Sequence, residues 1–224
     1  MTSRKKIALI ADDDEFFRMA LTSILASKLK FAEVIQAASL DEAVEKLSAR
    51  SDISLALFDL AMPGMASPAN LRAVRDCFKT LRVAVVSGSK SRRDVLSALE
   101  AGVHGYVPKG LGIAELGHAL QLIVDGVIYV PPSIAILPTA GEEKPIISPQ
   151  VPLPPRSALA VLTPRQRGVL ALLVEGKSNK AIARDLDLGE GTVKVHMAAL
   201  FRNLGVRTRT AAAVAGGRLL QPAT

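Results

Sequence analysis

Short apolar runs alternate with amphipathic stretches along the first half of this 224-residue chain. The clearest run, Leu55-Ala56-Leu57-Phe58, is bounded by turn residues and predicts a buried parallel strand. After an earlier run, Phe17, Leu21 and Leu25 recur at helical spacing and predict one apolar helix face. Five such strands alternate with five such helices, which predicts a doubly wound parallel sheet with right-handed crossovers. The predicted strands lie near residues 7–10, 34–35, 55–58, 81–86 and 105–107.

The C-terminal part of the chain shows helical patterns alone. Thr163 and Gln166 can form a capping box, and Pro164 suits the first position of a helix. Two later short helices are separated by a turn that contains glycine, which is typical of helix-turn-helix geometry. The residues expected to cap or begin the four helices are Thr163, Ser178, Thr192 and either Thr208 or Thr210.

Proline and charge divide the chain into the same two parts. Eight of the 13 prolines fall between Pro131 and Pro155, so we predict a Pro-rich linker over residues 129–157. Residues 1–156 carry 18 Lys/Arg against 17 Asp/Glu, net +1, whereas residues 157–224 carry 10 against 4, net +6. The basic excess of the C-terminal part points to a polyanionic partner there.

Other features of the composition exclude several classes of protein. Cys77 is the sole cysteine, so no internal disulfide is possible and a reducing compartment is expected. Its place in a predicted helix suggests that Cys77 packs near the core. The sequence has no long apolar span and no signal peptide at its start. We therefore expect a cytoplasmic protein without a membrane partner.

Polar side chains follow four of the predicted strands at the point where each strand ends. Asp12 and Asp13 follow the first, Asp59 the third, Ser87 the fourth and Lys109 the fifth. In an open parallel sheet the carboxyl ends of the strands form the ligand-binding edge. These five side chains are therefore expected to meet in one pocket. The alternative for Asp59 is a simple helix N-cap, a role that Asp often has after a strand.

The predicted pocket suits phosphoryl transfer. Three carboxylates within about 4 Å repel one another by roughly 4 kcal/mol per pair at an effective dielectric near 20. Such a group holds a proton or a divalent cation, and oxygen ligands suit Mg²⁺. Asp59 can then act as the nucleophile that forms an acyl phosphate, while Lys109 supplies a positive charge and Ser87 a hydroxyl donor.

Taken together, these residues resemble the receiver domain of two-component response regulators over about residues 5–128. The resemblance is carried by Asp12-Asp13, by Asp59 followed by Met62-Pro63-Gly64, by Ser87 and by Gly105-Tyr106-Val107-Pro108-Lys109. It implies a flavodoxin-like (βα)5 fold with a five-stranded parallel sheet. It also implies that Asp59 accepts a phosphoryl group from a sensor histidine kinase.

The same resemblance implies roles for other residues of the pocket. Tyr106 matches an aromatic residue that turns inward when Ser87 moves toward the phosphoryl group; alternatively, Tyr106 is only a half-buried strand residue. The metal would be Mg²⁺, with Asp12 acting through water. The implied metal ligands are Asp12, Asp13, Asp59 and the main-chain carbonyl of Ala61.

The C-terminal part is similar to the DNA-binding domain of LuxR-type regulators over about residues 159–217. The similarity is carried by Leu162-Thr163-Pro164-Arg165, Ser178-Asn179-Lys180, Ile182-Ala183, Gly191-Thr192-Val193-Lys194-Val195-His196 and Leu204-Gly205-Val206. Gly168 departs from the family pattern, and a glycine inside a helix costs about 1 kcal/mol against alanine. Together the two resemblances identify a member of the NarL/FixJ group, with a receiver over residues 1–128 and a small all-α helix-turn-helix domain over residues 158–224.

Candidate DNA contacts lie on and around the third helix. Helical spacing places Lys194 and Ala198 on an exposed face, with Val195 beside them. Lys194 can reach base edges or phosphate, and alanine can contact thymine methyl groups. Contacts with backbone phosphates are expected from Lys180, Thr192, His196 and Arg202.

These inferences predict a DNA-binding regulator rather than an enzyme. Phosphorylation of Asp59 is expected to change dimerisation or domain docking and so to control binding to promoter DNA as a homodimer. Two alternatives remain. The chain can act without phosphorylation, through protein contacts alone, or it can be a phosphatase with Asp12 as the nucleophile, although Phe16 and the lack of a large cap disfavour that class.

Overall fold

The computed structural model describes residues 6–65, 68–132, 134 and 162–220 of the chain. The chain divides into two compact units, Met1–Pro131 and Pro132–Thr224, and each is described by itself. Most of the predicted linker, 129–157, lies outside the described residues, so the two predicted domain boundaries, after residues 128 and 157, stay predictions. No helix among the described residues is both long enough and apolar enough to cross a membrane.

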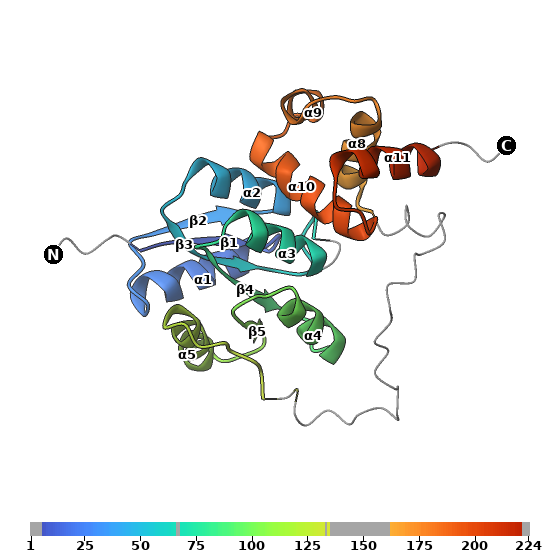
Figure 1. Cartoon of the computed structure of the whole chain (residues 1–224). Helices are drawn as coiled ribbons and strands as arrows, with labels where there is room; N and C mark the ends of the chain where they lie inside the picture. The colour runs from blue at the N-terminus through green and yellow to red at the C-terminus, as the bar shows by residue number, and fades with distance from the viewer. Residues whose placement is uncertain (1–5, 66–67, 133, 135–161, 221–224) are drawn as a thin grey trace, which may run out of the picture. The chain divides into compact units, whose positions relative to one another are not determined.

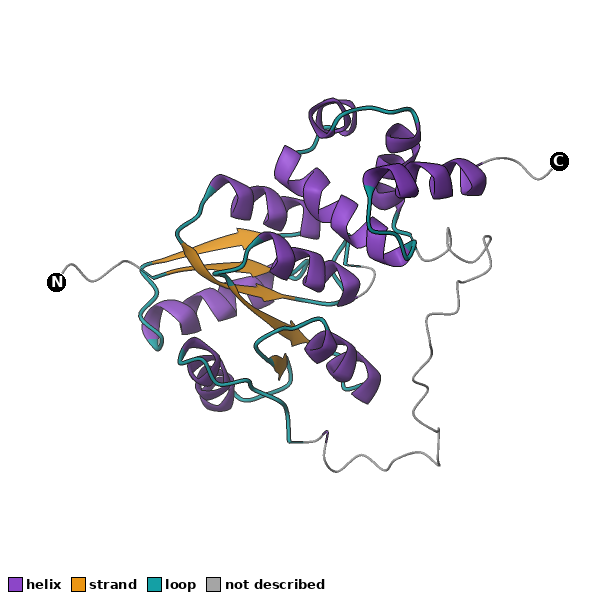
Figure 2. Ribbon diagram, viewed as in Figure 1, coloured by secondary structure: helices purple, strands orange, loops and turns teal. Residues whose placement is uncertain are grey.

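The first unit contains the predicted five-stranded parallel sheet (Figures 1 and 2). The strand order β2-β1-β3-β4-β5 places β1 and β3 side by side in the middle and makes β2 and β5 the edge strands. The residues of β1 are apolar and buried, and so are those of β3 apart from the exposed Ser54, as is usual for the middle of a parallel sheet. The strands are β1 Ile7–Ala11, β2 Glu33–Ala37, β3 Ile53–Phe58, β4 Arg82–Ser87 and β5 Tyr106–Pro108.

Five helices connect and follow these strands, which confirms the predicted alternation. Asp14 caps the first helix through the N–H of Phe17, and Ser39 caps the second through the N–H of Glu42. The prediction that Cys77 packs near the core is wrong. Cys77 is the last residue of its helix and is exposed, because Leu71 and Val74 occupy the buried positions. The helices are α1 Glu15–Ser27, α2 Leu40–Ala49, α3 Pro68–Cys77, α4 Arg92–Glu100 and α5 Ile113–Val124.

The second unit consists of four described helices around their own apolar core. The capping box of Thr163 and Gln166 is present, and Ser178 caps the next helix as predicted. The predicted cap at Thr192 is wrong: the third helix begins at Glu190 with Gly189 as its N-cap, and Thr192 lies buried in the first turn. The helices are α8 Pro164–Val174, α9 Asn179–Leu186, α10 Glu190–Asn203 and α11 Arg209–Leu220.

Two glycines inside helices of this unit should respond to alanine in opposite directions. A Cβ atom at Gly168 would lie 3.4 Å from Leu186 Cδ2, an ordinary contact, so Gly168→Ala should stabilise the unit by about 1 kcal/mol. A Cβ atom at Gly216 would overlap Leu170 and lie 2.9 Å from Val174 Cγ2, so Gly216→Ala should destabilise it by about 1–3 kcal/mol. Urea unfolding of both variants measures the two effects, and a shift of the same sign in both would contradict this packing.

Candidate functional site

Asp59 lies at the carboxyl end of β3, in the middle of the sheet. Its main-chain N–H donates to the Ala11 carbonyl at 2.8 Å, which continues the pairing of β3 with β1. The side chain is only 3 % exposed, and its Oδ1 atom has no hydrogen-bond partner among the described residues. A buried carboxylate oxygen without a donor is costly, so this atom has the environment of a reactive or ligand-binding group.

Two further carboxylates follow β1 and approach Asp59. Asp12 is buried, and its Oδ1 accepts the N–H of Asp14 at 3.0 Å. Asp13 is exposed toward solvent. One carboxylate oxygen from each of Asp12, Asp13 and Asp59 can be chosen so that all three lie within 4.8 Å of one another. The three carboxylates therefore converge at one edge of the sheet, as expected for residues that follow neighbouring parallel strands.

Lys109, at the end of β5, provides the positive charge of the site. Its Nζ atom lies 2.7 Å from Asp12 Oδ2 and 3.3 Å from Asp59 Oδ2. The ammonium group also lies 4.7 Å from the centre of the Phe17 ring, within the range of a cation–π contact. Lys109 thus joins the end of β5 to the carboxylates of β1 and β3.

Burial and mutual charge shift the pKa values of Asp12 and Lys109. Burial raises the pKa of Asp12 above its ordinary value, and the hydrogen bond from Lys109 offsets this only in part. Burial by itself would lower the pKa of Lys109, but the hydrogen bond with Asp12 and the charge of Asp59 outweigh it, so the pKa is raised. Lys109 therefore stays protonated at neutral pH.

The residues of this site fit an oxygen-liganded divalent cation. When ionised, the three carboxylates exceed the single ammonium by two negative charges. Asp59 Oδ1, which has no hydrogen-bond partner in the described part of the chain, adds an available ligand atom. Hard cations such as Mg²⁺ favour carboxylate oxygens and retain water, which the exposed side at Asp13 allows. Ala61 lies two residues after Asp59 in the loop that leaves β3, and the ligand role of its carbonyl stays a prediction.

Ser87 and Tyr106 lie on neighbouring strands of the same unit. Ser87 ends β4 and is buried, and its hydroxyl oxygen accepts the N–H of Ser89 at 3.3 Å. Tyr106 is fully buried, and its hydroxyl donates to the Ser89 carbonyl at 2.9 Å. Burial raises the pKa of the Tyr106 phenol. Tyr106 is therefore fully buried rather than half-buried, and its hydroxyl is tied to the loop after β4. Its role in a switch stays a prediction.

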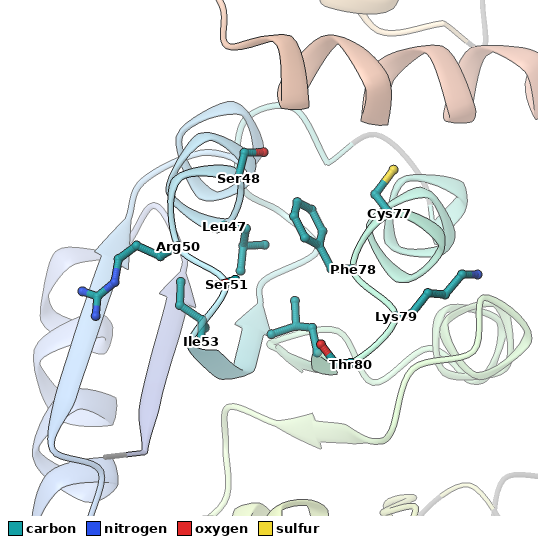
Figure 3. A pocket seen from close by; sticks show the side chains of 10 residues that line it. Leu47, Ser48, Arg50, Ser51, Ile53, Cys77, Phe78, Lys79 and Thr80 are labelled. Carbon is teal, nitrogen blue, oxygen red and sulfur yellow. The ribbon is translucent and has the colours of Figure 1, made fainter. Parts of the chain in front are cut away.

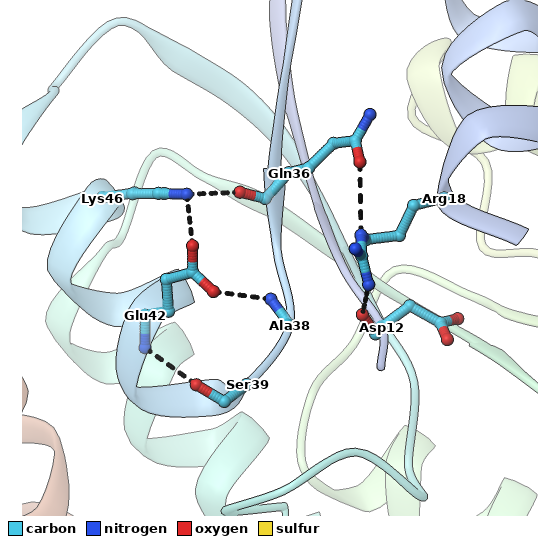
Figure 4. A network of polar contacts seen from close by, with 7 residues as sticks. All are labelled: Asp12, Arg18, Gln36, Ala38, Ser39, Glu42 and Lys46. Carbon is cyan, nitrogen blue, oxygen red and sulfur yellow. Dashed lines mark hydrogen bonds and ion pairs between the residues drawn. The ribbon is translucent and has the colours of Figure 1, made fainter. Parts of the chain in front are cut away.

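Arg18 is a residue of the site that the sequence analysis did not identify. Its Nη1 donates to the main-chain carbonyl of Asp12 at 2.7 Å, and its Nε donates to Gln36 Oε1 at 3.2 Å (Figure 4). Lys46 bonds both the Gln36 carbonyl and the Glu42 carboxylate, which extends the network to α2. An arginine in the second turn of the helix after the acidic residues is the signal that could have revealed this contact.

A separate pocket of about 340 Å³ lies where α2 and α3 lead into β3 and β4 (Figure 3). It is at the amino ends of these strands, the edge of the sheet opposite to Asp59. Its lining includes apolar Leu47, Ile53, Phe78 and Leu81 with Arg50 and Lys79 among them. Arg50 pairs with Glu33 and Asp52, and Lys79 pairs with Asp76, so both cations are already neutralised.

The candidate DNA contacts divide by exposure. Lys180 and Lys194 are exposed, and Ala198 and Arg202 are partly exposed. Thr192, Val195 and His196 also lie on α10, and Val195 is not part of the apolar core of the unit. Val193 and Leu200 belong to the core of the unit, as predicted, and they fix the rotation of α10. The DNA-contact role of the seven predicted residues stays a prediction.

Comparisons with known families match both units. The family model for the response regulator receiver domain matches residues 8–121, and that for bacterial regulatory proteins of the luxR family matches residues 160–215. Both matches agree with the resemblances that the sequence motifs carry.

Whole-chain relatives cover nearly the same length. The glycerol metabolism activator of Pseudomonas putida is 34% identical over 209 residues, 93% of this chain and 94% of the relative. The nitrate/nitrite response regulator NarL of Escherichia coli is 30% identical over 206 residues, 92% of each chain. A solved structure of the RcsB response regulator of Salmonella typhimurium aligns with a TM-score of 0.55 at 20% identity, over 95% of this chain and 98% of that one, and supports the fold.

Proposed function

This chain belongs to the transcriptional response regulators that join a receiver to a LuxR-type DNA-binding domain, and we propose that Asp59 is its phosphoryl acceptor. Phosphorylation-dependent control of transcription is the general property of this family. The observation that carries the assignment is the buried Asp59 carboxylate, which has one oxygen beside Lys109 and the other without a hydrogen-bond partner among the described residues. That arrangement leaves one oxygen available to attack phosphorus.

The proposed reaction is the transfer of a phosphoryl group from a phosphohistidine of a sensor kinase. Asp59 forms an oxygen–phosphorus bond while the nitrogen–phosphorus bond of the donor breaks, and the donor imidazole leaves. The Lys109 ammonium group, which contacts the carboxylates of Asp12 and Asp59, turns to the phosphoryl oxygens during the transfer. Asp13, Asp59 and the Ala61 carbonyl would hold Mg²⁺ directly and Asp12 would hold it through water; such an ion would supply positive charge to the transferred group.

The proposed output is a change in the pairing of the basic units. The added phosphoryl charge is local, so its effect requires an element with two states, for which Ser87 and Tyr106 are the candidates. Paired helix-turn-helix units bind two half-sites about one DNA turn apart and gain affinity without new contacts. The proposal therefore includes promoter DNA as the partner, a homodimer in the phosphorylated state and a cytoplasmic location.

The phosphatase alternative makes Asp12 the nucleophile. Both oxygens of Asp12 already have partners, since Oδ1 accepts from Asp14 and Oδ2 pairs with Lys109. This arrangement favours Asp59, whose Oδ1 has no partner among the described residues. Mass-spectrometric mapping of the phosphorylated residue decides between the two. The alternative of a regulator that needs no phosphorylation predicts that Asp59→Ala leaves transcriptional activity in cells unchanged.

Removal of one carboxylate should reduce the stabilisation of the protein by Mg²⁺. At free Mg²⁺ 100 times its dissociation constant, the wild type should gain about 2.7 kcal/mol in the free energy of unfolding. Asp13→Asn should lose most of this gain, and it should raise the melting temperature of the metal-free protein by about 2–4 °C because it removes like-charge repulsion. Thermal unfolding with and without Mg²⁺ measures both effects.

Asp14→Asn is the matched control for the metal site. It makes the same charge change one residue away, and asparagine retains the N-cap of α1. An equal Mg²⁺ response in the Asp13 variant and the wild type would contradict the proposed ligand set.

A further inference from the structure

The outer edge of β5 is covered by the segment that follows α5. The strand order leaves one side of β5 without a strand partner. On that side the N–H of Tyr106 donates to the Tyr129 carbonyl at 2.9 Å, and the N–H of Tyr129 donates to the His104 carbonyl at 3.2 Å. Tyr129 and Gly105 form a parallel bridge. Tyr129 therefore acts as a short additional strand that satisfies edge groups of β5.

The local packing is adapted to this close approach. A Cβ atom at Gly105 would lie 2.6 Å from Ile123 Cδ1 and 3.1 Å from the Tyr129 carbonyl oxygen. Glycine is therefore the residue that lets the two backbones meet. The Tyr129 ring packs against the core of the first unit, and Pro131 is buried. The docked position of this segment thus rests on main-chain bonds and on apolar contacts.

Tyr106 is held through both its side chain and its main chain. Its phenol bonds the carbonyl of Ser89, in the loop after Ser87, and its main-chain N–H bonds the carbonyl of Tyr129. The chain then continues from Tyr129 to Pro131, where the first unit ends. A continuous set of hydrogen bonds therefore joins the loop beside the proposed phosphoryl site to the start of the connection toward the DNA-binding unit.

We propose that Tyr129, through its main chain, is a positioning residue of the phosphorylation switch. Docked Tyr129 holds β5 in the register that keeps Tyr106 inward, and displacement of Tyr106 releases Tyr129 together with the residues that lead into the second unit. The inference rests on the proposed function of Asp59, because it assigns the path by which the state of that site reaches the DNA-binding unit.

A matched pair of variants in the full chain tests this role. Tyr129→Pro removes the N–H that donates to His104, whereas Tyr129→Ala removes the same ring and keeps that N–H. Both should accept phosphoryl groups at Asp59 within about twofold of the wild-type rate, since the pocket is untouched. Hydrogen exchange of the Tyr106 amide should be at least about tenfold faster in the proline variant than in the alanine variant.

The decisive readout is the coupling between the receiver and DNA. Affinity is measured with and without beryllofluoride, on the DNA sequence that the wild type selects from a random pool. The gain in affinity on adding beryllofluoride should fall by about five- to tenfold in Tyr129→Pro and should be retained in Tyr129→Ala. Should the proline variant fail to fold, Gly105→Ala, whose Cβ atom would overlap Ile123 and press on the Tyr129 carbonyl, should give the same loss of coupling with normal phosphoryl uptake.

The outcomes separate this inference from the proposed function. The role of Tyr129 would be overturned if the wild type gained DNA affinity with beryllofluoride and the proline and alanine variants showed the same gain and the same hydrogen exchange of the Tyr106 amide. Asp59 would remain the acceptor in that case. A wild type that takes up no phosphoryl group at Asp59 would instead overturn the proposed function, and the inference with it.

Discussion

Replacement of Asp59 by asparagine is expected to reduce phosphoryl acceptance by at least about 10³-fold. Asparagine keeps the size of the side chain and its place at the end of β3, but it has no anionic oxygen to attack phosphorus. The carboxylate oxygen that has no partner among the described residues is the atom that this change removes. Incubation with a small acyl phosphate and Mg²⁺, followed by intact-mass measurement, gives the extent of phosphorylation directly.

Glu15→Gln is the control for this experiment. Glu15 is an exposed carboxylate in the first turn of α1, so its loss changes the net charge equally without touching the pocket. It should be phosphorylated as fast as the wild type. Full phosphorylation of the Asp59 variant, or a phosphoryl group mapped to Asp12, would show that the acceptor has been assigned to the wrong residue.

The sequence was sufficient to predict the sheet and the convergence of its polar residues. Apolar runs such as that before Asp59 can hardly form anything but buried strands when helices follow each of them. Once the strands are parallel, their carboxyl ends share one edge, so Asp12 and Asp59 must approach each other. No side-chain detail was needed for that step, and the 2.7 Å contact between Lys109 and Asp12 agrees with it.

Contacts that depend on tertiary geometry were missed. Arg18 lies one turn beyond the acidic residues, and only the placement of Gln36 on the neighbouring strand directs its guanidinium to the Asp12 carbonyl. Tyr129 likewise binds β5 through main-chain hydrogen bonds, which any residue type can form and which the sequence therefore does not predict. Sequence patterns describe side-chain types along one element, whereas these contacts join two elements.

Local signals also competed at helix ends. Thr192 is a good N-cap residue, but Gly189 is the N-cap of α10, because the apolar residue Val193 needs a helical position to reach the core. Cysteine is a residue type that is often buried, yet Cys77 is exposed because it lies at the C-terminal end of α3. In both cases packing of the whole unit decided against the preference of the single residue.

Lys194 is the exposed cation on α10, the second helix of the helix-turn-helix pair, and its removal should weaken DNA binding most among single changes on that helix. Lys194→Ala should cost about 1–3 kcal/mol per half-site, or roughly 5–150-fold in affinity. A phosphate contact would lower affinity equally for all sequences and reduce the salt slope by about 1, whereas a base contact would reduce discrimination between sequences.

Arg218→Ala provides the control for Lys194, since Arg218 is an exposed cation in the last turn of α11. It removes the same charge from the same unit, so it reports the general electrostatic contribution to binding. Fluorescence anisotropy over a series of salt concentrations compares the two variants. If both lost the same small amount of affinity, Lys194 would contribute only to the overall charge, and DNA would be bound through a surface other than α10.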